Sequence, residues 1–166
     1  MKLKRAFVMV GVALAALALA ATSIQGAKGH GVAVNENGIR GQFEFDVKKV
    51  HHNDRTEIGG PFHFRAADTA HHRGVEIVMP RARLFAKDGN VAEFGGPARA
   101  VFVEGDHRIV REGALRVRVA DRRNHDHPEG DPDLLGLRFA TEHDVFVFEF
   151  AGRVTEGDII VYERNE

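Results

Sequence analysis

The densest group of side chains with coordinating chemistry lies in one short segment, residues 121–133. The segment is rich in carboxylates and histidines, and its proline and glycine residues are typical of a loop. Oxygen ligands of this kind suit Ca²⁺, which takes about six to eight of them. The candidate metal ligands are Asp121, His125, Asp126, His127, Glu129, Asp131 and Asp133.

Two ions fit this segment, and a third interpretation needs no ion. Calcium would use the carboxylates together with the amide of Asn124, although the spacing differs from the EF-hand pattern. Zinc needs about four ligands, so His125 and His127 would need partners from elsewhere: His51, His52, His71, His72 or His143. The alternative is a solvated hairpin loop whose turns are set by Pro128, Gly130 and Pro132. The sequence leaves all three interpretations open.

Two histidine pairs, His51-His52 and His71-His72, stand beside predicted strand ends. Neighbouring residues of an extended chain point to opposite faces, so such a pair rarely supplies two ligands to one ion. We expect exposed loop histidines here, with a pH-responsive or metal-binding role as the alternative.

A third set of charged residues consists of arginines at outward-facing strand positions. In register across neighbouring strands, they would form a basic stripe for an anionic polymer or a phosphate. Ordinary cross-strand pairing with Glu44, Glu76 and Glu149 explains the same pattern without a ligand. The arginines are Arg81, Arg83, Arg99, Arg116, Arg118 and Arg138.

The composition removes several kinds of chemistry. Ser23 is the only serine and there is no cysteine, so a folded domain that starts further along the chain has no serine or cysteine nucleophile. The chain also lacks tryptophan and has one tyrosine, whereas sugar-binding surfaces stack sugars on exposed aromatic rings. Nucleotide-binding glycine motifs and the HExxH zinc-protease motif are absent. Carboxylate-pair catalysis stays open, but the sequence favours a protein that is not an enzyme.

The elements that must position these groups are β-strands. From residue 40 onward apolar residues recur with a period of two, which places alternate side chains on one face of a strand. Glycine and acidic turn signals separate the runs, as in 59–61, 87–90, 95–97, 104–106 and 156–158. The apolar positions of the three clearest runs are Phe43, Phe45 and Val47; Phe62 and Phe64; and Leu115, Val117 and Val119.

Two further runs depart from simple alternation. In residues 145–150 both parities are apolar, which predicts a central strand covered on both sides at the heart of the core. Over residues 75–85 the apolar parity changes at Pro80, which predicts a bulge or a strand break. Together the runs predict an all-β fold, an antiparallel β-sandwich or a flattened barrel of about eight strands.

Five short segments occur in an order that resembles a known group. They are GQFEF (41–45), GPFHF (60–64), GNVAEFGG (89–96), LRVRVAD (115–121) and GDIIV (157–161). The chain resembles a loosely defined group of secreted bacterial β-sandwich proteins, sometimes labelled post-COAP domains, over residues 38–163. The group often has a Gly-Glu-Pro-Gly style loop where this chain has HPEGDPD at 127–133. The resemblance implies a secreted β-sandwich and no particular activity.

The first residues have the layout of a secretory signal peptide. Lys2, Lys4 and Arg5 precede an uncharged apolar run over residues 6–21 that ends in small residues, as before a signal-peptidase site. We therefore expect a signal helix within residues 1–21 and export to the periplasm or the medium. The alternative is an uncleaved segment that anchors the protein to the membrane.

The remaining chain sets the domain organisation. Removal of residues 1–21 from the 166 leaves 145 residues, the size of one domain. We predict a flexible lead-in over 22–37 and one β-sandwich domain over 38–166. Loss of the three basic residues lowers the formal net charge from −1 to −4, which argues against nucleic acid as a partner.

These observations favour a secreted, non-catalytic binding or structural module of bacterial origin whose partner is an extracytoplasmic ligand or protein. The alternative is a calcium- or zinc-binding protein, or a metal-dependent enzyme, built on loop 121–133. The sequence assigns no cofactor beyond these two candidate ions.

Overall fold

The computed structural model describes residues 22–68, 71, 73–123 and 130–165. The predicted signal peptide and its helix at 1–21 lie outside the described residues. The described chain is all-β, as predicted, with one short 3₁₀ helix, η2 (Glu142–Asp144). Its strands are β1 (Thr22–Asn35), β2 (Arg40–His52), β3 (Arg55–Gly59), β4 (Phe62–Asp68), β5 (Arg73–Met79), β6 (Leu84–Asp88), β7 (Val91–Glu104), β8 (His107–Ala120), β9 (Leu134–Ala140) and β10 (Val147–Asn165).

Eight of these strands close into one antiparallel barrel, in the order β1-β10-β9-β8-β7-β5-β4-β2 and back to β1. β3 adds to β2 and β6 adds to β7 as short side strands. Of the two predicted architectures, the sandwich is therefore wrong and the flattened barrel describes the fold. Alternation reveals which face of a strand is dry, but it does not reveal whether the first and last strands meet.

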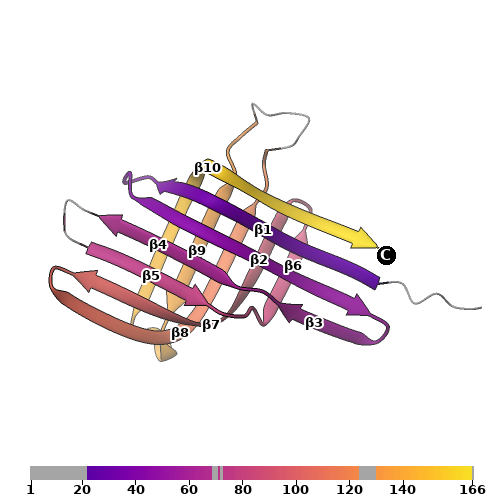
Figure 1. The fold of residues 1–166 in the computed structure, drawn as a ribbon, viewed down its shortest axis with the longest axis horizontal. Coiled ribbons are helices and arrows are strands. Elements are labelled where there is room, and N and C mark those ends of the chain that lie inside the picture. Colours follow the sequence, from indigo (N-terminus) through magenta and orange to yellow (C-terminus); the bar gives the residue numbers. More distant parts are fainter. Residues whose placement is uncertain (1–21, 69–70, 72, 124–129, 166) are drawn as a thin grey trace, which may run out of the picture.

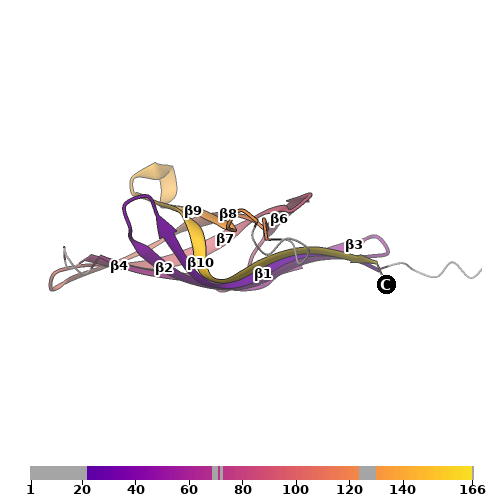
Figure 2. The ribbon, with the colours of Figure 1, turned by 90° about the horizontal axis from the view of Figure 1, so that it is seen from above.

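The barrel is flattened into two layers whose strands cross (Figure 1). One layer contains β1, β2, β3 and β4, and the other contains β6, β7, β8 and β9 (Figure 2). β10 belongs to both layers because its first part pairs with β9 and its remainder pairs with β1. This one long strand joins the layers along one side of the barrel.

β10 and β1 come very close at one register position, where Gly31 faces Gly157. Both have positive φ, 151° and 86°, a region that L side chains rarely adopt. A Cβ on either residue would overlap a backbone oxygen of the opposite strand, Glu156 O or His30 O. Next to this pair the register shifts between Val32 and Ala33, so glycine and a β-bulge together form the bend.

β1 corrects the prediction of a flexible lead-in over residues 22–37. It pairs along its length with both β10 and β2. Its inward positions carry small residues, including the fully buried Ala27 and Ala33, instead of the large apolar residues that mark a strand in a sequence. Large side chains of the neighbouring strand β2 lie close to these small residues; a Cβ on Gly29, for example, would meet Phe45 at 3.0 Å.

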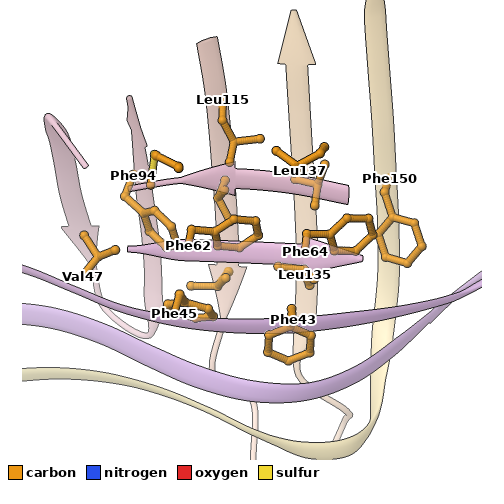
Figure 3. Packing of buried hydrophobic residues seen from close by; sticks show 14 of the residues in the cluster. Phe43, Phe45, Val47, Phe62, Phe64, Phe94, Leu115, Leu135, Leu137 and Phe150 are labelled. Atoms are coloured by element: carbon orange, nitrogen blue, oxygen red, sulfur yellow. The ribbon is translucent and has the colours of Figure 1, made fainter. Parts of the chain in front are cut away.

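The barrel interior is a packed apolar core (Figure 3). The alternation predicted for the three clearest runs is confirmed, because all of their apolar positions are buried and the charged residues between them are exposed. Phe62 lies at 6.0 Å from Phe45 and 5.9 Å from Phe94 between ring centroids. Side chains, and not solvent, therefore occupy the middle of the barrel, as is usual for eight strands.

The two irregular runs have different outcomes. Pro80 follows the last residue of β5, so the predicted strand break is confirmed, although Leu84 beyond it is 58% exposed and Phe85 is buried instead. Residues 145–150 are not a strand covered on both sides: Val145 is 85% exposed and Val147 39% exposed. Only one parity of this segment faces the barrel, and it lies at an open end.

The side strand β6 is tied to the other layer by one polar contact. Lys87 Nζ lies 3.3 Å from Glu163 Oε2 on β10, and Gln25 Nε2 on β1 donates a 3.4 Å hydrogen bond to Glu163 Oε1. The Gln25 hydrogen bond, then the hydrogen bond and charge of Lys87, hold the pKa of Glu163 below its ordinary value. An inward-facing lysine on a side strand also discourages pairing with another chain.

Candidate functional site

The predicted metal loop is described only in part. His125, Asp126, His127 and Glu129 lie outside the described residues, as does Asn124. Within the described residues, no group of three or more His, Cys, Asp or Glu side chains is placed to hold a metal ion. Asp121, Asp131 and Asp133 can therefore be assessed only for what each contacts.

Asp133 is fully buried and serves as a hydrogen-bond acceptor for the backbone. Its Oδ1 accepts from the amides of Arg122 and Arg123 at 2.8 and 3.0 Å. Its Oδ2 accepts from the amide of Ile159 on β10 at 3.1 Å. Both carboxylate oxygens thus fasten the two ends of the loop to each other and to β10.

Asp121 and Arg123 strengthen the same attachment. Asp121 Oδ2 accepts from the Val161 amide at 3.1 Å, two residues beyond the Ile159 contact. Arg123 Nη2 donates to the carbonyl oxygen of Val154 at 3.1 Å. By contrast, the Asp131 side chain is 82% exposed, and its nearest described cation is Arg122 Nη1 at 3.8 Å. In the described residues, the acids at the loop base have a structural role.

The histidine pairs are at the surface where the structure describes them. His51 and His52 are exposed, as predicted, but they are the last two residues of β2 and not loop residues. His51 Nδ1 lies 2.9 Å from Thr56 Oγ1 on β3, and His52 Nδ1 lies 2.8 Å from Thr22 Oγ1 on β1. His71 Nδ1 lies 2.7 Å from a carboxylate oxygen of Asp68. His72 lies outside the described residues.

A hollow of about 660 Å³ opens at the end of the barrel opposite loop 121–133. That loop connects the end of β8 to the start of β9, whereas the hollow contains residues from the start of β8 and from the start of β10. We call it the mouth. Its apolar lining includes Ile39, Val75, Phe102, Val103, Ile109, Phe146, Phe148 and Phe150.

The mouth exists because inward-facing residues continue past the packed interior. Phe102, Phe146 and Phe148 are only partly buried and pack at the edge of the core. Their rings contact one another, with 4.6 Å between the centroids of Phe102 and Phe146 and 5.9 Å between those of Phe102 and Phe148. The opening therefore presents aromatic faces and edges to anything that enters.

Paired polar groups surround the mouth. Arg73 Nη2 lies 2.9 Å from Glu104 Oε1, on adjacent strands. Asn35 Oδ1 accepts from the amides of Asn37 and Ile39 at 3.0 and 2.8 Å and so shapes the β1–β2 turn. Two further acids line the rim: Asp68 Oδ2 lies 2.7 Å from His71 Nδ1, and Glu149 Oε1 lies 3.2 Å from Arg138 Nε. The charged groups of the rim thus each contact another side chain. This arrangement suits an apolar molecule that adds no charge of its own.

Sequence reasoning assigned no function to the mouth. The feature of the sequence that corresponds to the mouth is the apolar run at 145–150. A strand needs apolar residues on only one parity to face the core, so apolar residues on both parities indicate additional apolar surface. The other lining residues lie on separate strands and meet only when the barrel closes. Comparison of the chain with protein-family models, with curated proteins and with solved structures finds no significant match. Among the described residues, no helix has the length and apolar character needed to cross a membrane.

Proposed function

We propose that the protein is a non-catalytic binding module that holds a small, uncharged, largely apolar molecule in the mouth of its barrel. The observation that carries this proposal is the ring of partly exposed phenylalanines around a hollow of about 660 Å³. Ligand sites in proteins are typically concave, mostly apolar and bounded by a few polar groups, and barrel mouths are among their usual positions.

The packed interior determines how deep a ligand would enter. Phe150 lines the mouth, Phe64 lies beside it with 4.9 Å between the ring centroids, and both are buried. A ligand would therefore rest on these rings and not pass through the barrel. Contact with half-exposed aromatic rings would remove their remaining apolar surface from water, which favours binding by about 25 cal/mol per Å².

We also propose that binding takes place outside the cytoplasm. The basic start and the uncharged apolar run over residues 6–21 support export. Expression of the full chain in a bacterial host, followed by cell fractionation and mass spectrometry, tests this step. A shortened chain outside the cytoplasm is the expected result, and a full-length cytoplasmic chain contradicts it.

A neutral fluorescent probe, N-phenyl-1-naphthylamine, tests the mouth directly. Ile109 and Val110 form a matched pair, because they are neighbours on β8 with 41% and 40% exposure. Ile109 lines the mouth opposite Phe102, whereas Val110 faces outward opposite Val101. Replacing Ile109 with lysine should place a charge beside the bound probe at little cost to folding.

The expected result is saturable probe fluorescence with the unmodified protein, at least tenfold weaker binding to Ile109→Lys and unchanged binding to Val110→Lys. Circular dichroism melts establish that both variants are folded. Absence of saturable binding, or equal binding to the two variants, contradicts the proposal.

A further inference from the structure

A second hollow, of about 600 Å³, lies over β6, β7, β8 and β9. It faces outward, because the exposed residues Leu84, Arg116 and Arg118 line it, whereas the inward-facing residues of these strands belong to the core. The strand register places its residues in rows. One row runs Leu84, Gly95, Arg116, Arg138, and the next runs Ala86, Glu93, Arg118, Gly136.

Glycines provide the depth of this hollow. Gly136 lies between outward-facing side chains, and a Cβ added to it would meet only the carbonyl oxygen of Arg118, at 3.8 Å. At Gly95 a Cβ would lie 2.5 Å from the Leu115 carbonyl oxygen, so this glycine lets β7 and β8 approach closely. Because neither position has a side chain, backbone atoms form the floor of the hollow. The guanidinium groups around it belong to Arg116, Arg118 and Arg138.

The arginines around this floor differ in whether a carboxylate forms an ion pair with them. Arg118 pairs with Glu93 at 3.3 Å, and Arg138 pairs with Glu149 and with Asp144, both at 3.2 Å. These contacts agree with the cross-strand pairing expected from the sequence. No carboxylate of the described residues lies within ion-pair distance of Arg116, although Arg116 sits directly opposite Arg138 on the neighbouring strand.

Arg118 is already paired with one carboxylate and Arg138 with two, so the three arginines and the three carboxylates of this region carry no net charge together. Arg116 is the arginine of this group that has no carboxylate of its own among the described residues, and a bound oxyanion would accept hydrogen bonds from its planar guanidinium. One unpaired guanidinium suits one small anion, whereas a long polyanion would be repelled by Glu93, Glu149 and Asp144.

Leu84 indicates what the anion is attached to. It is 58% exposed at the end of the first row, across Gly95 from Arg116. A ligand whose oxyanion contacts Arg116 would extend over Gly95 and place its other end against Leu84. We infer that this outer hollow is a second binding site, separate from the mouth, for a small organic molecule with a phosphate or carboxylate group and an apolar body.

Isothermal titration calorimetry with phenyl phosphate tests this site. Inorganic phosphate and phenol carry the two halves of the probe separately, and a sulfated polysaccharide represents a long polyanion. The informative variants are Arg116→Gln, which removes this guanidinium, and Gly136→Leu, which fills the hollow at a position with open space. Arg99→Gln is the matched control, because Arg99 is also an outward arginine but pairs with Glu112, outside the hollow.

We expect phenyl phosphate to bind more tightly than either half. Arg116→Gln and Gly136→Leu should each weaken it at least tenfold, whereas Arg99→Gln and Ile109→Lys should leave it unchanged. Equal losses in Arg99→Gln and Arg116→Gln, equal affinity for inorganic phosphate, or tighter binding of the polysaccharide would overturn the inference. Because Ile109→Lys tests only the mouth, failure at one site is distinguishable from failure at the other.

Discussion

The two ends of the barrel differ in how they are closed: one is closed by a buried carboxylate, and the other leaves aromatic side chains partly exposed. At the loop 121–133 end, the buried carboxylate of Asp133 accepts three backbone hydrogen bonds and seals the connection to β10. At the mouth, three phenylalanines remain half-covered, and the Asn35 side chain, which accepts two backbone hydrogen bonds there, shapes the β1–β2 turn and is not buried like Asp133. The comparison teaches that the two ends contribute differently to stability: substitutions at the sealed end should destabilise the fold more than substitutions at the mouth, where we propose that a ligand binds.

The largest expected effect is at the sealed end. Asp133→Ala would leave three backbone amides without their acceptor, and each buried orphan donor costs about 1 to 3 kcal/mol. We expect a loss of about 3 kcal/mol or more in the free energy of unfolding, measured by urea denaturation. This contrasts with the small effect anticipated if Asp133 belonged to an exposed turn.

Asp131→Ala is the matched control for that experiment. Its side chain is 82% exposed, so its loss should change the unfolding free energy by no more than about 0.5 kcal/mol. Equal effects at Asp131 and Asp133 would mean that the buried carboxylate does not seal this end.

The difference between two phenylalanine variants distinguishes the interior from the mouth. Phe62 is fully buried in the core, and Phe62→Ala should cost about 3 to 5 kcal/mol. Phe146 is only partly buried at the mouth, so Phe146→Ala should cost about 1 to 2 kcal/mol, because less apolar surface returns to water. If urea denaturation gives the same loss for both variants, the mouth is packed like the interior and the contrast between the regions disappears.

The smallest expected effect concerns acid pH and the contact between the layers. The pKa of Glu163 is held below its ordinary value of 4.5 in the folded protein, so its ionised form adds stability above that value. This contribution is lost as pH falls from about 4.5 through the lower folded pKa. Glu163→Gln should lack it, and its difference from the unmodified protein in thermal melts should shrink between about pH 6 and pH 3. A difference independent of pH would contradict the assignment.

The strands with large apolar residues could be predicted from the sequence because alternation follows directly from strand geometry. Phe43, Phe45 and Val47 illustrate this, since a period of two requires one dry face. β1 could not be predicted in this way, because its inward alanines and glycines carry no hydrophobic signal. Its place in the barrel depends on the bulky neighbours that face it, which lie elsewhere in the chain.

The sites were harder to predict for two different reasons. A carboxylate such as Asp133 has the same composition signal as a metal ligand, and only burial shows that its oxygens are already used by backbone amides. The mouth and the outer hollow depend on register between distant strands. Leu84, Arg116 and Gly136 become neighbours only once β6, β7, β8 and β9 are aligned, and short-range sequence patterns contain no information on that alignment.

The two-sided pairing of β1 also has a consequence for the order of folding. β1 and β2 can form a hairpin as soon as they are made, but the other edge of β1 waits for β10, which follows all the other strands in the chain. Until then its backbone donors and acceptors form an open template for another chain. Contacts between such distant segments form slowly. We therefore expect the protein to be most prone to aggregation before β10 pairs with β1, and the pairing of these two strands to remove the exposed edge.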